Sequence, residues 1–150
     1  MKLIDLYEAV SKRYVYHVTF TKNVKNIMSQ GLKPFQTSNW SKGPGGDRYN
    51  EEGGVFAFEH PEDAFKWAFK QKFAFKKPVS IIKMKRGNTW EVDPSQDISL
   101  QMGKGKALRS IAAVKAGDMI EAFDFDDFGT PGDLGISQQD WIKGIIDKLS

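Results

Sequence analysis

The segment Tyr14-Val-Tyr-His-Val-Thr-Phe20 constrains the fold more than any other part of the chain. It consists of β-branched and aromatic residues and holds no helix former, so it predicts a β-strand. Side chains alternate between the two faces of a strand. Tyr14, Tyr16, Val18 and Phe20 therefore share one face, which we expect to meet the core. Val15, His17 and Thr19 share the other face.

Hydrophobic spacing and capping signals predict the remaining elements. Helices are expected at residues 1–11, 22–30, 61–76 and from Ser137 to the C-terminus. Further strands are expected at residues 55–58, 79–85, 89–92, 108–114 and 119–125. Loops are expected at residues 36–54, which include six glycines or prolines, and at residues 124–135, which are rich in acid, glycine and proline.

Local signals also predict where these helices begin and end. Thr21 and Ser137 are expected N-caps, Gly31 is the expected C-terminal stop, and Pro61 is the expected first helical residue. The apolar period of the helix at 61–76 consists of Ala64, Phe65, Ala68, Phe69 and Phe73. The order of elements, without an internal repeat or linker, predicts one α+β domain spanning residues 1–150.

Several classes of protein are disfavoured by composition. The chain has no cysteine, which excludes disulfides, iron–sulfur clusters, thiolate nucleophiles and cysteine zinc sites. Its two histidines, His17 and His60, form no H-E-x-x-H motif, so we expect no metal site. The N-terminus lacks the apolar core of a signal peptide, and no stretch approaches eighteen apolar residues. We therefore expect a cytoplasmic protein with no membrane partner.

Charge is distributed unevenly along the chain. Residues 117–150 carry two lysines against eight acidic residues, a net charge of −6, which leaves +9 on residues 1–116. An anionic ligand would be attracted to the basic part, whether a phosphate-bearing small molecule, a nucleic acid or an acidic protein. A charge pattern that only confers solubility is the alternative interpretation.

Common nucleotide-binding and hydrolase motifs are absent. The glycine-rich run Gly43-Pro-Gly-Gly46 is followed by Asp47-Arg48 and not by the Lys-Ser/Thr of a P-loop. Neither a G-x-G-x-x-G turn between strand and helix nor a G-x-S-x-G elbow occurs. Asp124, Asp126 and Asp127 could bind a cation, but an acidic loop of this kind is more often simply solvated.

One combination of segments is more specific. Tyr16-His-Val-Thr19 is followed by Ile27-Met-Ser-Gln-Gly-Leu32 and then by Gly54-Val-Phe-Ala-Phe58. This series resembles the ADP-ribosyltransferase superfamily, with its His-x-Thr strand, its I-x-x-x-G-L phrase and its second strand of the type Gly-(Ile/Val)-Tyr-Phe-Ala. The resemblance covers residues 14–70. It extends to the RNA 2′-phosphotransferases, which share the fold, although their N-terminal RNA lobe has no counterpart in this sequence.

The resemblance implies a split antiparallel β-sheet with flanking helices, whose two halves form a cleft for NAD, the substrate. It implies that His17 hydrogen-bonds a ribose hydroxyl with the support of Thr19, and that the backbone at Val18 meets the carboxamide. Phe56 would stack on the nicotinamide in the place of the family's usual tyrosine, in the same crevice as His17. Arg48 or Lys42 could pair with the pyrophosphate. The alternative interpretation is that His17 has only a structural role, with its imidazole hydrogen-bonded inside the sheet.

The chain departs from the family in lacking its catalytic glutamate. Family members place a glutamate at the strand that corresponds here to Leu108–Val114, where it steadies the positive charge of an oxocarbenium-like transition state. This chain has Arg109 and Ser110 instead. A cation cannot stabilise a developing cation, so Arg109 fits the phosphate-handling branch better. Glu121 is the nearest acid, about a dozen residues away in the sequence, and is not assigned the role.

Three functions follow as hypotheses. The first is an NAD-binding transferase, of phage or toxin type, that moves ADP-ribose to a protein or nucleic acid in the cytoplasm. The second is a catalytically silent member of the fold that binds nucleic acid or an ADP-ribosylated partner. The third is an inhibitor whose acidic residues 117–150 mimic nucleic acid and block a protein.

Overall fold

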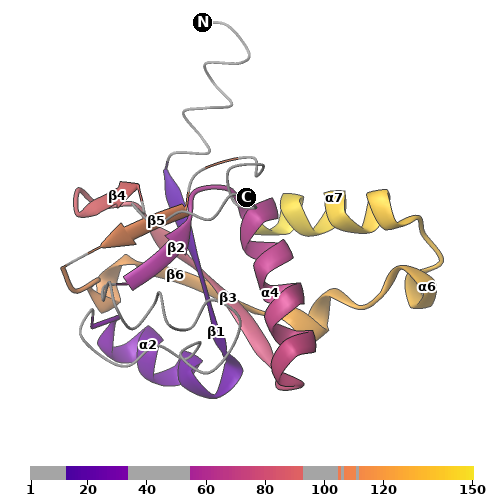
Figure 1. Cartoon of the computed structure of the whole chain (residues 1–150), viewed down its shortest axis with the longest axis horizontal. Coiled ribbons are helices and arrows are strands. Elements are labelled where there is room, and N and C mark those ends of the chain that lie inside the picture. The colour runs from indigo at the N-terminus through magenta and orange to yellow at the C-terminus, as the bar shows by residue number, and fades with distance from the viewer. Residues whose placement is uncertain (1–12, 34–54, 93–104, 106, 111) are drawn as a thin grey trace, which may run out of the picture.

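A computed structural model of the chain describes residues 13–33, 55–92, 105, 107–110 and 112–150. Its centre is a six-stranded antiparallel sheet with the strand order β4-β5-β2-β1-β3-β6 (Figure 1). The strands are β1 (Tyr14–Phe20), β2 (Val55–Phe58), β3 (Val79–Lys85), β4 (Trp90–Val92), β5 (Ala107–Ser110) and β6 (Met119–Asp124). The expected α+β class is therefore confirmed.

Pairing within this sheet is uneven. β1 pairs with β3 along its whole length, from Tyr14 opposite Lys85 to Phe20 opposite Val79. In the described part of the chain, the register of β1 with β2 consists of one pair, Tyr16 opposite Phe58. β2 in turn pairs with β5 through all four of its residues. The register between β1 and β2 is thus the shortest that the described strands form.

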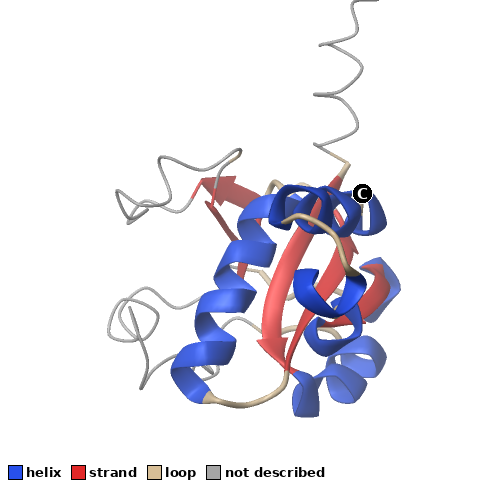
Figure 2. Ribbon diagram, turned by 90° about the vertical axis from the view of Figure 1, so that its right-hand side faces the viewer, coloured by secondary structure: helices blue, strands red, loops and turns tan. Residues whose placement is uncertain are grey.

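Four α-helices occur in the described part of the chain: α2 (Val24–Gln30), α4 (Pro61–Phe75), α6 (Pro131–Leu134) and α7 (Gln138–Leu149). Short 3-10 turns, η1 (Thr21–Asn23), η2 (Ala116–Asp118) and η3 (Phe125–Phe128), precede or follow strands. Figure 2 shows α4 running alongside the strands, and its C-terminal end leads directly into β3. None of these helices has the length and apolar character needed to cross a bilayer.

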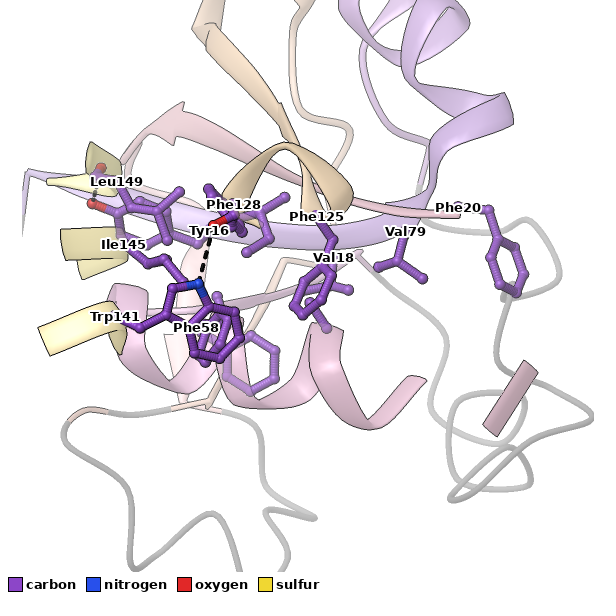
Figure 3. Packing of buried hydrophobic residues seen from close by; sticks show 14 residues of the cluster. Tyr16, Val18, Phe20, Phe58, Val79, Phe125, Phe128, Trp141, Ile145 and Leu149 are labelled. Carbon is purple, nitrogen blue, oxygen red and sulfur yellow. Dashed lines mark hydrogen bonds between the residues drawn. The ribbon is translucent and has the colours of Figure 1, made fainter. Parts of the chain in front are cut away.

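Apolar side chains cover both faces of the sheet. On one face, β1 and β3 pack against α4, η3 and α7 to form the first core (Figure 3). Its buried members are Tyr16, Val18, Phe20, Phe58, Ala64, Phe65, Ala68, Val79, Ile81, Phe125, Phe128, Trp141, Ile145 and Leu149. On the other face, α2 covers a second core of Val15, Ile27, Val55, Ala57, Ile82, Met84, Leu108 and Val114. The central strand β1 is therefore buried from both sides.

Two buried hydrogen bonds attach the C-terminal part of the chain to the first core. The Tyr16 hydroxyl donates to the Leu149 carbonyl oxygen at 3.0 Å, and the Trp141 Nε1–H donates to the Phe128 carbonyl oxygen at 3.0 Å (Figure 3). Burial raises the pKa of Tyr16 to about 12, so the hydroxyl keeps its proton at physiological pH. The acidic residues 117–150 are consequently part of the folded domain and not a separate tail.

Many local predictions are confirmed. The bounds of β1 and β3 and the start of α4 at Pro61 agree with the sequence signals. Tyr16, Val18 and Phe20 lie in the first core, whereas Val15 lies in the second. The Ser137 side chain caps α7 by accepting from the Asp140 N–H at 3.1 Å.

Other local predictions are wrong. Thr21 does not cap α2, because its hydroxyl is hydrogen-bonded to the Ser80 hydroxyl at 2.8 Å. The strand expected at residues 108–114 ends at Ser110, and only an isolated bridge joins Val114 to Leu32. The loop expected at residues 124–135 contains η3 and α6. The helix expected at residues 1–11 and the loop at 36–54 lie outside the described residues.

Gly31 ends α2 as predicted and provides a test of the fold. Its φ is +79°, and a Cβ at this position would lie 2.1 Å from the backbone oxygen of Val114. We expect Gly31→Ala to lower the free energy of unfolding by about 2 kcal/mol or more, because positive φ and a backbone clash both oppose a side chain. Urea denaturation would measure the change.

Gly144 in α7 is the matched control for Gly31. A Cβ there would meet nothing within 4 Å, and the residue lies inside a helix. Gly144→Ala should therefore raise stability by up to about 1 kcal/mol. An equal response of the two alanine variants would contradict the assigned role of Gly31.

Candidate functional site

His17 lies in the middle of β1, next to Tyr16, the residue at which β1 pairs with β2. It faces the α2 side of the sheet, because its pairing partner Ile82 belongs to the second core. The imidazole Nδ1 is 2.7 Å from the carbonyl oxygen of Phe56 on β2. A side-chain hydrogen bond therefore links the two strands close to the backbone pair Tyr16 and Phe58.

The contact with Phe56 sets the chemical state of the His17 ring. Burial lowers the pKa of His17, and the hydrogen bond to the Phe56 carbonyl opposes that effect only in part. The imidazole is therefore neutral at physiological pH. A carbonyl oxygen can only accept, so Nδ1 carries the single ring proton. Nε2 is left with a lone pair and can accept a hydrogen bond from a hydroxyl group.

A polar row continues from β1 across the same face of the sheet. Thr19 is fully buried and lies opposite Ser80 of β3, which in turn lies opposite Asp124 of β6. The Ser80 hydroxyl is 2.8 Å from the Thr21 hydroxyl and donates to the Asp124 carboxylate at 2.7 Å. Thr19 thus stands between His17 and a hydrogen-bonded cluster that the sequence motifs did not reveal.

Phe56 does not share a crevice with His17. Its neighbours Val55 and Ala57 belong to the second core and Phe58 to the first, so alternation along β2 turns the Phe56 ring toward the α4 side. Only the carbonyl oxygen of Phe56 meets the imidazole. The expectation that both side chains enter one crevice is therefore wrong, because it assigned faces on two strands without knowing their register.

On its own face, Phe56 lies in a row with Arg109 and Glu91. Phe56 is opposite Arg109 on β5, and Arg109 is opposite Glu91 on β4. The Arg109 guanidinium donates to Glu91 Oε1 at 2.8 Å, and the Arg109 side chain is 17% exposed. The ion pair places the carboxylate of Glu91, a residue that the sequence motifs did not single out, beside Arg109. Arg109 is also separated from His17, because the two side chains project from opposite faces.

The remaining predicted site residues are placed as follows. Val18 is buried in the first core, so its side chain is structural and only its backbone could meet a ligand. Arg48 and Lys42 lie outside the described residues. Glu121 is exposed on β6 opposite Lys83, at the other end of the sheet from β5. His60 caps α4, since its Nδ1 accepts from the Glu62 N–H at 3.1 Å.

Metal binding finds no geometric support in the described ranges, where no three histidine or acidic side chains come together. Comparisons of the chain with protein-family models, with curated proteins and with solved structures find no match. The site must therefore be judged from its own geometry.

The lowered pKa of His17 predicts a dependence of stability on pH. The ordinary histidine pKa of 6.5 applies to the unfolded chain, whereas the folded chain holds this residue at a lower value. Below pH 6.5, His17 becomes protonated in the unfolded chain, whereas in the folded chain it stays neutral until the pH is lower. The contribution of neutral His17 to stability is therefore complete above that pH and is lost as the pH falls through the folded pKa.

We expect His17→Asn to show a smaller loss of stability between about pH 7.5 and pH 5 than the unchanged protein. Asparagine keeps a donor near the position of Nδ1 but does not titrate. Urea denaturation at both pH values measures the difference, and carboxylate titrations cancel in the comparison. Identical pH dependence in the two proteins would contradict a lowered His17 pKa.

Proposed function

We propose that this chain is an ADP-ribosyltransferase-like domain that binds NAD as a substrate through His17 and transfers ADP-ribose to a protein or nucleic acid. The observation that carries the proposal is the neutral imidazole of His17, held by the Phe56 carbonyl at the junction of β1 and β2. The acceptor molecule is not specified by these residues.

The sheet supports the proposal by its uneven pairing. The resemblance of residues 14–70 to the superfamily implies a sheet split into two halves, with the nucleotide in the cleft between them. Among the described residues, the register of β1 with β2 consists of the pair Tyr16 and Phe58, whereas β1 pairs with β3, and β2 with β5, along their whole lengths. Division along this line would leave His17 and Thr19 on one half and β2 with β5 on the other.

The tautomer of His17 matches the role that the resemblance implies. A ribose hydroxyl needs an acceptor for its proton, and Nε2 is an acceptor only while the ring is neutral and Nδ1 is protonated. Desolvation favours the neutral ring, and the hydrogen bond to the Phe56 carbonyl places the single proton on Nδ1. A hydrogen bond of this kind positions the ribose without the histidine taking part in bond breaking.

The two other predicted roles need revision within this proposal. Phe56 contributes its carbonyl oxygen to the site, since its ring lies on the opposite face. Arg109 could hold a phosphate only by exchanging Glu91 for that anion, because the two are already paired. Neither residue supplies the carboxylate that would steady an oxocarbenium-like transition state.

The lack of a carboxylate at the position expected for the catalytic glutamate favours a second function, that of a catalytically silent binding domain. The position expected for the glutamate is occupied by β5, where Arg109 is paired and Ser110 is fully buried. A domain of this kind could bind NAD or an ADP-ribosylated partner without cleaving the nicotinamide bond. The test must therefore distinguish NAD binding without catalysis from ADP-ribose transfer.

The test measures NAD binding and nicotinamide release separately. A ligand at a hundredfold excess over its dissociation constant should stabilise the protein by about 2.7 kcal/mol, which raises the melting temperature. We expect NAD to produce this shift and His17→Asn to weaken NAD binding roughly tenfold, because one hydrogen bond to the ribose is lost. Nicotinamide release, followed by chromatography, reports the transfer step.

His17→Gln is the matched variant, since its amide reaches the position of Nε2. It should retain more affinity for NAD than His17→Asn, provided that circular dichroism shows both variants folded. NAD binding without nicotinamide release would favour the silent domain. If neither NAD nor ADP-ribose raises the melting temperature at millimolar concentration, the nucleotide site should be abandoned.

A further inference from the structure

The outer face of α4 carries an arrangement that the NAD proposal does not use. Phe69 and Lys70 each lie three or four residues from both Lys66 and Phe73, so the four side chains form one stripe about two residues wide along the helix. All four are exposed, with Phe69 at 41% and Phe73 at 65%. The sequence predicts that Phe69 and Phe73 share the apolar face of the helix with Ala64, Phe65 and Ala68. The structure buries those three residues and leaves the two phenylalanines exposed.

The two exposed rings pack against each other, and Phe69 also packs against the first core. Phe69 and Phe73 have ring centroids 4.7 Å apart, and Phe69 also lies 6.0 Å from Phe125 and 6.3 Å from Phe65. Phe65 and Phe125 are buried members of the first core and stack on each other with an interplanar angle of 9°. The core therefore supports Phe69 from beneath, and Phe69 supports Phe73. Little conformational entropy would be lost when a flat group stacks on them.

The exposed charged residues of α4 next to these rings are lysines. Lys66 and Lys70 lie between and beside the phenylalanines, and the exposed Lys76 and Lys77 follow at the end of α4. The acidic residues of the helix lie in its first turn, where Asp63 is buried and accepts a hydrogen bond from the Gly105 N–H at 2.9 Å. On the flank, Asp126 pairs with Lys72, which does not belong to the stripe.

We propose that this stripe binds single-stranded nucleic acid, with bases stacking on Phe69 and Phe73 and phosphates meeting Lys66 and Lys70. Every base has a face that can stack on an aromatic ring, so such contacts tolerate any sequence. Lysines attract the backbone at the same time and make the binding sensitive to salt. The surface lies on the opposite side of the sheet from His17, so the inference does not depend on NAD binding.

The interleaving of lysines and rings favours a nucleic acid over a lipid surface. A helix that lies in a membrane interface gathers its apolar residues on one face and places its cations on the other. In α4 the most apolar face is already buried against the sheet, and the exposed phenylalanines are interspersed with lysines on the same outer face. Binding to anionic vesicles is therefore an outcome that would count against the proposal.

The test uses fluorescence anisotropy with labelled single strands of about twelve nucleotides, oligo(dT) and oligo(U), at low salt. Phe73→Ala should weaken binding to at least one of them roughly tenfold, because base stacking on that ring is lost. The double variant Lys66→Gln/Lys70→Gln should reduce the slope of log affinity against log salt by about 1.4, the value for two phosphate contacts. Circular dichroism would verify that each variant is folded.

Matched controls lie on α7 and α6. Lys143→Gln/Lys148→Gln removes the same charge from another exposed helix face, and Leu134→Ala removes an apolar side chain that is 55% exposed. Neither control should change the affinity by more than about twofold. The proposal is overturned if no single strand binds, if Phe73→Ala binds like the unchanged protein, if the controls weaken binding equally, or if anionic vesicles bind and oligonucleotides do not.

Discussion

The burial of β1 on both faces is the constraint on which the rest of the structure depends. Tyr16 and Val18 enter the core under α4, and Val15 enters the core under α2. A polar side chain in such a strand must find a partner, because an unsatisfied polar group in the interior is costly. His17 finds one in the Phe56 carbonyl of the neighbouring strand, at 2.7 Å. The candidate site and the junction of the two strands are thus one feature.

This arrangement links stability with chemistry. The same burial that makes the hydrogen bond to Phe56 necessary lowers the pKa of His17 and keeps the ring neutral. Neutrality leaves Nε2 able to accept a hydrogen bond from a hydroxyl group. Thr19 and the cluster of Ser80 and Asp124 extend the polar character along the same face.

The His17 site and the stripe on α4 lie on different sides of the sheet and would bind their ligands by different interactions. His17 is a half-buried acceptor at a strand junction, whereas the stripe on α4 is an exposed set of rings and cations. The net charge of the sequence does not distinguish the two surfaces, because both belong to residues 1–116, whose net charge is +9. The structure separates them by placing α4 against the first core and His17 beside the second.

The sequence by itself determined the strand Tyr14–Phe20, the limits of α4 and α7 and the turn at Gly31, because alternation, caps and glycine act over a few residues. Only the tertiary structure decided that Phe56 turns away from His17, that Arg109 pairs with Glu91 and that Phe69 and Phe73 stay exposed. Those outcomes depend on strand register and on which helix face the sheet can accommodate. Both arise from contacts between residues far apart in the chain, which local patterns do not encode.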